Sequence, residues 1–322
     1  MVTETFDIVT GGAGFIGSHI CRALLKEGRT VVALDNFSTG KHENIEGLAE
    51  EFGRKFRVLD QDIRDDALER AFEGAETIYH HAAQPSVQRS VEDPLTANSV
   101  NVEGTLRVLV AARDAGVAKL VFASSSSIYG DSNLLPKIEE MTPDPVSPYA
   151  LTKCVGEMYC RVFTQIYGLP TIALRYFNVF GPRQDPNSEY SAVIPRVVTR
   201  MLAGQRPIIY GDGEQSRDFT FVQDVVRANL LAARSDAKGI GVNIACGNRY
   251  SLNQLVASLN QVMGSRLEAI YEPPRLGDIR HSEAGIALAE ETIRFKPSTS
   301  FPEGLQRTVE WFQKKDSQKS VG

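Results

Sequence analysis

Short runs of β-branched and aromatic residues alternate with longer stretches of helical pattern through the first half of the chain. Six of these runs are predicted to be strands, at residues 6–10, 30–35, 56–60, 77–80, 119–124 and 171–176. Such alternation is typical of a parallel sheet, because each strand is followed by a right-handed crossover before the next strand pairs. The sequence therefore predicts an α/β fold with a doubly wound parallel sheet and helices on both faces.

The alternation fades after about residue 177, where loops rich in Gly, Pro and Arg begin. Two later stretches, 219–222 and 242–244, have strand character and could return to the first sheet. We therefore expect two parts, each built from more than one segment of the chain. They are a first domain over 1–176 with returning segments at about 217–245, and a smaller mixed α/β lobe over 177–216 and 246–318.

Charge and composition disfavour several classes of function. The 322 residues carry a formal net charge of −5, so no broad cationic surface is expected for nucleic acid or an anionic membrane. No apolar run approaches the roughly 20 residues of a membrane span, and the first residues lack a secretory pattern. The four cysteines show no CxxC or Cys/His spacing, so neither a disulfide framework nor a metal site is expected. A cytoplasmic location fits best.

A glycine loop joins the first predicted strand to a helix. Gly11 permits a tight turn, Gly14 lets backbone amides approach a pyrophosphate, and Gly17 lets the helix pack closely on the strand. The spacing is GxxGxxG, and by itself it could be a plain turn. With the acid described next, it predicts a dinucleotide site.

Two acidic residues follow the second and third predicted strands. Asp35 ends the second strand, at the position expected for the carboxylate that binds the adenosine ribose. Because Asn36 follows it and not an arginine, NAD is favoured over NADP. Asp62 could accept a hydrogen bond from the adenine amino group, or it could be a solvated loop acid. We interpret His80 and His81, after the fourth strand, as structural.

The fifth strand and a later helix carry the chemical motif. Ser125 lies in a run of four serines at the strand's end, while Tyr149 and Lys153 are one turn apart on a helix predicted to start at Ser147 and Pro148. A lysine ammonium and a nicotinamide cation both favour the phenolate, which can then take a proton from a substrate hydroxyl. By themselves, Tyr149 and Lys153 could be an unrelated pair on the surface of the helix.

Together, the motifs GGAGFIG, SSSSIYG and YALTK, with the strand-ending Asp35, resemble the extended short-chain dehydrogenase/reductase family of nucleotide-sugar enzymes. The resemblance implies a Rossmann fold, Ser125 and Tyr149 as catalytic serine and base, and Lys153 as the residue that lowers the pKa of the tyrosine. Dehydratases of this family commonly carry an Asp-Glu pair where this chain has Ser125 and Ser126. The motifs therefore look more like those of a C4 epimerase, and most like those of epimerases acting on UDP-N-acetylglucosamine.

The resemblance also implies which residues contact the cofactor, NAD. The expected set is Gly11, Gly14, Phe15, Ile16, Gly17, Asp35, Asn36, Ser38, Gly40, Asp62, Ile63, Ala82, Ala83, Gln84, Asn98, Tyr149, Lys153 and Tyr176.

Three later segments, at 175–178, 216–219 and 275–278, carry arginines suited to a diphosphate. Each could instead form a surface salt bridge, such as Arg217 with Asp218. The resemblance assigns the UDP-sugar to Ser125, Ser126, Ser127, Asn178, Val193, Arg217, Arg275, Asp278 and Ser282.

Residue 282 is a serine where epimerases restricted to unsubstituted hexoses resemble one another in having tyrosine. The smaller side chain leaves room for a 2-acetamido group. We therefore expect turnover of UDP-GlcNAc and UDP-GalNAc, and of UDP-Glc and UDP-Gal as well.

Other functions stay open at this point. The chain could be a UDP-glucuronate 4-epimerase, an unusual UDP-sugar dehydratase, or a catalytically silent NAD-sensing module. The family typically forms two-fold dimers through paired helices, and Val108, Met158 and Phe163 are apolar residues that such a homodimer would bury. Packing against the sheet would explain them equally well.

Overall fold

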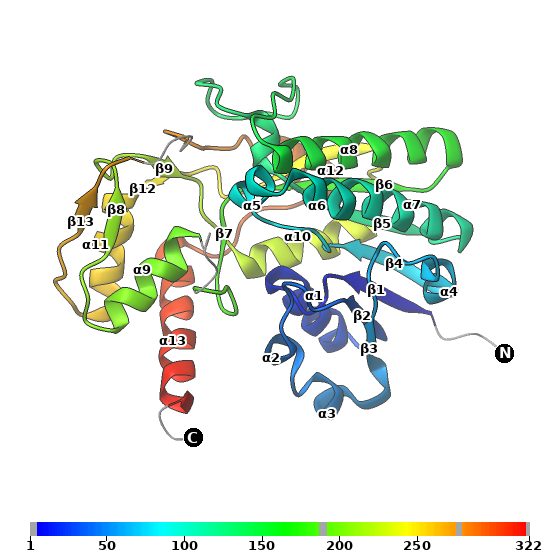
Figure 1. Ribbon diagram of the computed structural model, residues 1–322, viewed down its shortest axis with the longest axis horizontal. Coiled ribbons are helices and arrows are strands. Elements are labelled where there is room, and N and C mark those ends of the chain that lie inside the picture. Colours follow the sequence, from blue (N-terminus) through cyan, green and yellow to red (C-terminus); the bar gives the residue numbers. More distant parts are fainter. Residues whose placement is uncertain (1–4, 187–191, 275–278, 320–322) are drawn as a thin grey trace.

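The computed structural model describes residues 5–186, 192–274 and 279–319 (Figure 1). Within these residues, seven parallel strands form one sheet in the order β3-β2-β1-β4-β5-β6-β11. The strands are β1 (Phe6–Thr10), β2 (Val31–Asp35), β3 (Phe56–Asp60), β4 (Ala75–His80), β5 (Lys119–Ser125), β6 (Thr171–Tyr176) and β11 (Ile240–Ile244). The predicted doubly wound parallel sheet is confirmed.

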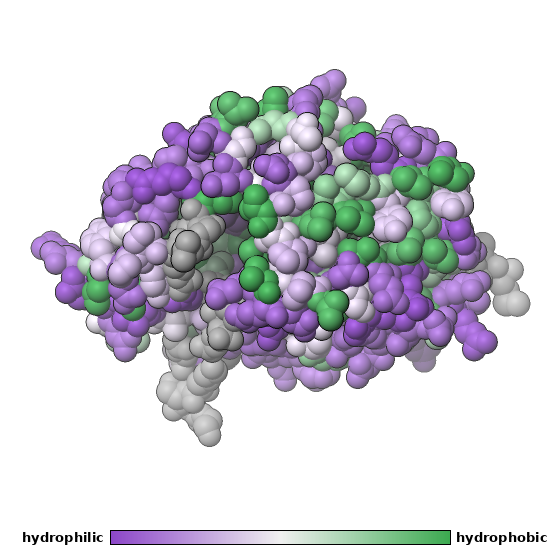
Figure 2. Space-filling view, turned by 45° about the horizontal axis from the view of Figure 1, so that its top comes forward, coloured by the Kyte–Doolittle hydropathy of each residue, from purple (hydrophilic) through white to green (hydrophobic). Residues whose placement is uncertain are grey.

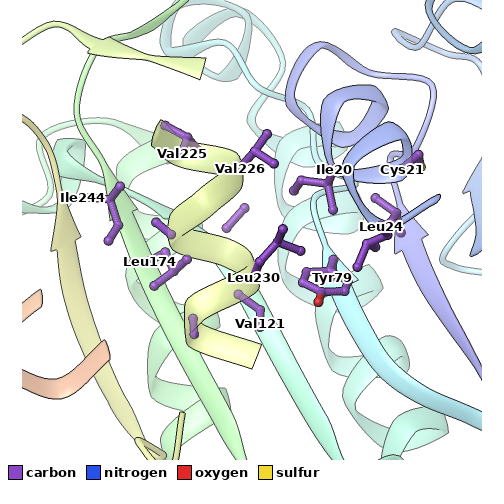
Figure 3. Close-up of a cluster of buried hydrophobic side chains, with 14 of the residues drawn as sticks. Ile20, Cys21, Leu24, Tyr79, Val121, Leu174, Val225, Val226, Leu230 and Ile244 are labelled. Atoms are coloured by element: carbon purple, nitrogen blue, oxygen red, sulfur yellow. The ribbon is translucent and has the colours of Figure 1, made fainter. Parts of the chain in front are cut away.

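Helices cover both faces of this sheet. One face packs against α1 (Phe15–Lys26), α10 (Val222–Arg234) and α12 (Ala287–Ile293), with the short α2 (His42–Ile45) and α3 (Leu48–Phe52) beside them. Figure 3 shows Val225, Val226 and Leu230 of α10 pointing into this layer beside Val121 and Leu174. The other face packs against α4 (Leu68–Phe72), α7 (Gly104–Asp114) and α8 (Pro148–Tyr167). The central strands are nearly continuous apolar runs because helices bury both faces of the sheet.

The two stretches expected to return to the sheet behave differently. Residues 242–244 do return, in β11, which pairs with β6. Residues 219–222 do not, and that expectation was wrong. Only Thr220–Phe221 is extended, as β10, and it pairs with β7 (Val179–Phe180) in a separate two-stranded sheet. The edge of β6 is already occupied by β11, and the chain enters α10 directly after Phe221.

The remaining elements form a smaller mixed lobe with its own core. Its helices are α9 (Val193–Leu202), α11 (Leu252–Met263) and α13 (Phe301–Lys319). Two short sheets join β8 (Ile208–Tyr210) to β13 (Ile270–Glu272), and β9 (Ser216–Arg217) to β12 (Tyr250–Ser251). The core gathers Phe180, Val198, Leu255 and Leu305. Figure 1 shows this lobe beside the carboxyl edge of the large sheet.

The helices α5 (Val87–Glu92), α6 (Pro94–Asn98) and a π-helical turn (Ser99–Glu103) lie against α8. The sequence offered three apolar residues on this side of the molecule, to be buried either by a dimer or by the sheet. Only Met158 is exposed, while Val108 and Phe163 are buried in the core under α7 and α8, because they occupy the faces turned to the sheet. In the described part of the chain, no helix is both long enough and apolar enough to cross a membrane.

Candidate active site

The predicted site residues gather where the parallel strands end. The glycine loop follows β1, Asp35 ends β2, residues 82–84 follow β4, Ser125 ends β5 and Asn178 follows β6. The carboxyl ends of parallel strands meet at one edge of a sheet, and ligands of open α/β sheets bind in the crevice outside this edge. The smaller lobe lies beside this edge.

The glycine loop has the close contacts that its spacing predicts. Gly11 adopts a φ of +69°, and a Cβ there would lie 2.7 Å from the amide nitrogen of Ala82. A Cβ on Gly17 would lie 2.1 Å from the carbonyl oxygen of Gly11, so the helix can approach the loop only with glycine at this position. Gly14 caps α1 without a side-chain hydrogen bond, and the partly buried Phe15 and Ile16 open the helix. This arrangement fits a pyrophosphate group.

Asp35 organises the loop after β2. Its carboxylate accepts hydrogen bonds from the amides of Ala13, at 2.9 Å, and Phe37, at 2.8 Å. A Cβ on Gly40 would come within 2.6 Å of the same carboxylate, so Gly40 leaves the room that Asp35 needs. Burial raises the pKa of Asp35, although the two amide hydrogen bonds oppose this. Ser38 donates its amide to the exposed Asn36.

Asp62 is a more heavily bonded acid than the sequence suggested. Its oxygens accept from Arg64, through the backbone amide, Nε and Nη2, and from Nδ2 of Asn36. The hydrogen bonds from Arg64 lower the pKa of Asp62 to about 2. Asp62 is therefore ionised at neutral pH and lies beside Asn36 at the adenosine end of the expected cofactor path. Its neighbour Ile63 is buried and contacts Gly104.

The segment after β4 depends on an asparagine that sequence reasoning missed. Asn101 is buried; its Oδ1 accepts the amide of Gln84 at 2.7 Å, and its Nδ2 donates to Thr152. It thereby ties residues 82–84 to α8. Asn98, three residues earlier, was predicted to contact the cofactor, and it is exposed at the end of α6. The sequence places both asparagines in one helical stretch and gives no signal that separates them.

The two histidines after β4 make protein contacts. His80 is fully buried between the hydroxyls of Thr10 and Thr105, and His81 lies 3.0 Å from the hydroxyl of Tyr176, which also bonds Asn229. Burial lowers the pKa of both histidines, that of His81 to about 3. Both are therefore neutral at physiological pH. The contact with His81 orients Tyr176, one of the expected cofactor residues.

The chemical motif assembles at the end of β5. The side chain of Ser125 lies close enough to the Tyr149 hydroxyl to lower the pKa of this phenol. Ser125 Oγ accepts from the amide and the hydroxyl of Ser127, at 3.2 and 2.9 Å, in the turn Ser126–Tyr129. Lys153 is buried, donates to the carbonyl oxygen of Ala123 at 2.8 Å, and lies 5.8 Å from the ring centre of Tyr149. The α8 helix that carries both residues starts with Ser147 as its cap, as expected.

The protein alone does not lower the pKa of this tyrosine. Loss of solvent raises the pKa of Tyr149 to about 12, although the neighbouring Ser125 side chain opposes this, and burial lowers the pKa of Lys153 to about 8. These residues alone do not favour the phenolate, because loss of solvent outweighs the effect of Ser125; that Lys153 and the cofactor together lower this pKa stays a prediction. A further positive charge beside the ring is needed, and an oxidised nicotinamide is one.

The structure describes some of the expected substrate residues and not others. Arg217 donates to the carbonyl oxygens of Ser216 and Arg280, and Asn178 donates to that of Asp218. Ser282 is partly buried and lies beside Ser216 on a neighbouring segment, and Val193 is the first residue of α9. Arg275 and Asp278 lie outside the described residues.

Arg175 contradicts one expectation, since it cannot meet a diphosphate. It is buried and forms an ion pair with Glu157 at 2.9 Å. The sequence could not show this, because the two residues lie on different elements, α8 and β6. Asp218 is likewise buried, and its carboxylate accepts the amides of Cys246, Gly247 and Ala284.

A family model described as the NAD dependent epimerase/dehydratase family matches residues 8–245. The chain belongs to this family. A putative UDP-glucose 4-epimerase of Methanocaldococcus jannaschii is 42% identical over 309 residues, which cover 95% of this chain and 98% of that protein.

Solved structures agree with this family assignment. The UDP-N-acetylglucosamine 4-epimerase from Methanobrevibacter ruminantium, in complex with UDP-N-acetylmuramic acid, has a TM-score of 0.92 and 40% identity, covering 98% of this chain and all of that chain. The UDP-glucose 4-epimerase of Thermus thermophilus, in complex with NAD, has a TM-score of 0.86 and 38% identity, covering 96% and 99%.

Proposed function

We propose that this chain is an NAD-dependent UDP-hexose 4-epimerase. The observation that carries the proposal is the place of Tyr149 beside Ser125, with Lys153 buried one turn away, at the carboxyl edge of a sheet whose glycine loop fits a pyrophosphate. The 4-epimerases among its relatives and structural neighbours support the reaction. The absence of an acidic pair at Ser125 and Ser126 favours epimerisation over dehydration.

The cofactor fits the residues that the structure presents. The glycine loop and the N-terminus of α1 would hold the pyrophosphate of NAD, and Asp35 the adenosine ribose. When bound, NAD supplies a reversible hydride acceptor, which lets C4 be oxidised to a ketone and reduced from the opposite face.

The chain's own residues would move the proton and hold the substrate. Oη of Tyr149 takes a proton from the hydroxyl on C4 and later returns it. Ser125 Oγ, which lies beside that phenol, orients O4. Because the sugar must present either face of C4, binding energy belongs on the UDP part, where Asn178 and Arg217 are placed.

Incubation with UDP-Glc, UDP-Gal, UDP-GlcNAc and UDP-GalNAc, followed by chromatography, tests the proposal. We expect each sugar to be converted into its C4 epimer, with no loss of water or carbon dioxide by NMR. Conversion of UDP-glucuronate alone would replace this proposal by the glucuronate epimerase. Tightly held NAD without turnover of any UDP-sugar would favour a silent NAD-sensing module.

We further propose that residue 282 sets the sugar range. Ser282 is partly buried, and its amide is bonded to Ser216, next to Arg217. A serine here is small enough to leave space for an acetamido group on C2. We therefore expect the acetamido sugars to be substrates together with the unsubstituted hexoses.

We also propose a two-fold homodimer through α8. Leu151, Met158, Val162 and Ile166 are 53%, 55%, 39% and 69% exposed and share one face of this helix. Leu95 of the adjacent α6 is 82% exposed. Figure 2 shows hydrophobic residues gathered among polar ones on this side of the molecule. Sedimentation of the wild type and of Val162→Glu tests the proposal: we expect a dimer and a weakened dimer, and a monomeric wild type at micromolar concentration would contradict it.

A further inference from the structure

Two consecutive residues at the end of β5 are each held by a side chain from α8, and the next residue lies beside a third. Lys153 donates to the carbonyl oxygen of Ala123, and the side chain of Ser125 lies near the hydroxyl of Tyr149. Between them, the hydroxyl of Ser124 donates to Oε1 of Glu157. Tyr149, Lys153 and Glu157 follow one another at four-residue spacing, so they form a column on one face of the helix.

Glu157 is also the partner of Arg175. Nε of Arg175 donates to Oε1 at 3.0 Å and Nη2 donates to Oε2 at 2.9 Å, and the two side chains are only 8% and 5% exposed. Arg175 lies beside Ser124 in the register of β5 and β6. The paired hydrogen bonds of a guanidinium and a carboxylate fix their relative geometry. The pair therefore sits over the strand position next to Ser125.

The network continues to the far side of the serine turn. Nη1 of Arg175 donates to the Tyr129 hydroxyl at 2.7 Å, and that hydroxyl donates to Oδ1 of Asn243 at 2.7 Å. Tyr129 ends the turn that begins at Ser126. The ion pair thus fixes the serine turn at both ends, through Ser124 before it and through Tyr129 after it.

The neighbouring strand leaves space for the pair. A Cβ on Gly241 of β11 would lie 3.0 Å from both Nε of Arg175 and Oε2 of Glu157. Any larger residue would have to push the two side chains aside. Gly241 therefore offers a way to displace the pair without changing its charge.

We propose that Glu157 and Arg175 are positioning residues for the epimerase reaction: they hold Ser125 against Tyr149, and Glu157 supports the positive charge of Lys153. This inference rests on the proposed function. A buried ion pair contributes little net stability against an apolar replacement, so stability alone does not explain these charges.

The surroundings of Lys153 make Glu157 the nearby carboxylate that acts on its charge. On α8, the titratable groups around Lys153 are Tyr149, Glu157 and the buried thiol of Cys160. The neutral His80 and His81 lie at the end of β4 and just after it. On β6, Arg175 lies beyond Glu157. Burial lowers the pKa of Lys153 to about 8, and interactions with Cys160 and Glu157 oppose that shift. Because burial raises the pKa of Cys160, its thiol stays protonated, and Glu157 supplies the negative charge. Without the carboxylate, the ammonium loses its proton at a lower pH.

The experiment compares Glu157→Gln with a matched control, Asp7→Asn. Asp7 is also buried and is paired with Arg29 at 2.8 Å, but at the amino end of β1, away from the site. We expect both variants to lower the unfolding temperature. Only Glu157→Gln should lower kcat, by about 10- to 100-fold with KM little changed, and move the alkaline limb of kcat to lower pH by about one unit.

Two more variants separate geometry from charge. Glu157→Asp keeps the carboxylate, so its alkaline limb should return close to that of the wild type. Gly241→Ala should lower kcat without moving the alkaline limb of its pH dependence. This variant serves as the test of positioning if Glu157→Gln fails to fold.

The pKa of Lys153 can be measured without any substrate, by NMR of protein labelled with 13C at lysine Cε and assigned with Lys153→Met. A wild type that turns over no UDP-hexose would remove the proposed function, and the titration would still report on the support of Lys153. Two results overturn the inference: an unchanged Lys153 pKa in Glu157→Gln, or losses of kcat in Glu157→Gln and Gly241→Ala no larger than in Asp7→Asn.

Discussion

The backbone amide of Ser282 donates to the carbonyl oxygen of Ser216 at 3.0 Å. This hydrogen bond holds residue 282 beside Arg217, one of the residues expected to bind the diphosphate. A change of side chain at 282 therefore acts next to Arg217 while the backbone stays in place.

Ser282→Tyr should suppress turnover of UDP-GlcNAc and UDP-GalNAc and spare UDP-Glc and UDP-Gal. The ring would fill the space that an acetamido group needs, and a steric clash of this kind reduces kcat/KM by on the order of 100-fold. Initial rates with all four sugars measure the effect, and Ser282→Ala is the control that keeps the space open. Equal losses for both classes of sugar would refute the gate.

Tyr149→Phe should leave NAD binding intact and lower turnover by on the order of 100-fold or more, the scale of a lost acid/base step. The substitution removes only the phenolic hydroxyl beside Ser125. Bound NAD is measured by absorbance after denaturation, and turnover by chromatography. Near-normal turnover would rule out the proton transfer proposed for Tyr149.

Gly17→Ala should abolish NAD binding. Its Cβ would lie 2.1 Å from the carbonyl oxygen of Gly11, so the glycine loop must shift. Gly116→Ala is a suitable control, because its φ of +67° strains any substitution while no atom lies within 4 Å of the added Cβ. Calorimetric titration with NAD compares the two. Normal NAD affinity in Gly17→Ala would show that the loop does not hold the pyrophosphate.

The free energy of unfolding should fall as the pH is lowered from about 6.5 to about 4. Burial lowers the pKa of His19 from 6.5 to about 4, so the unfolded chain takes up this proton first and stability is lost as the pH falls. The difference of about 2.5 units corresponds to roughly 3 kcal/mol below pH 4. Urea unfolding at several pH values measures it.

His19→Gln should weaken the pH dependence of the free energy of unfolding. His42→Gln, at an exposed histidine, should leave this dependence unchanged. His80 and His81 are also buried with lowered pKa values, so some acid sensitivity should remain. An identical pH dependence in the wild type and His19→Gln would contradict the assignment.

Local sequence was sufficient for the sheet and for its carboxyl edge. Predicted residues 6–10, 56–60 and 171–176 coincide with β1, β3 and β6. Apolar runs between turn residues specify buried strands, and a glycine triplet specifies a close approach of backbone, whatever lies elsewhere in the chain. For the same reason, Ser125, Tyr149 and Lys153 could be recognised as one set from their places on predicted elements.

The tertiary structure alone decided which charged and polar groups are available. Arg175 looked like a diphosphate ligand, but Glu157 on another element occupies its guanidinium. Asn101 was not distinguished from Asn98, and burial raises the pKa of Tyr149 in the protein alone, whereas the predicted fall includes the charge of a bound nicotinamide. Pattern along the chain determines backbone geometry over a few residues. The partner of a side chain and its exposure to water depend on groups that are distant in sequence and meet only when the sheet and its helices pack together.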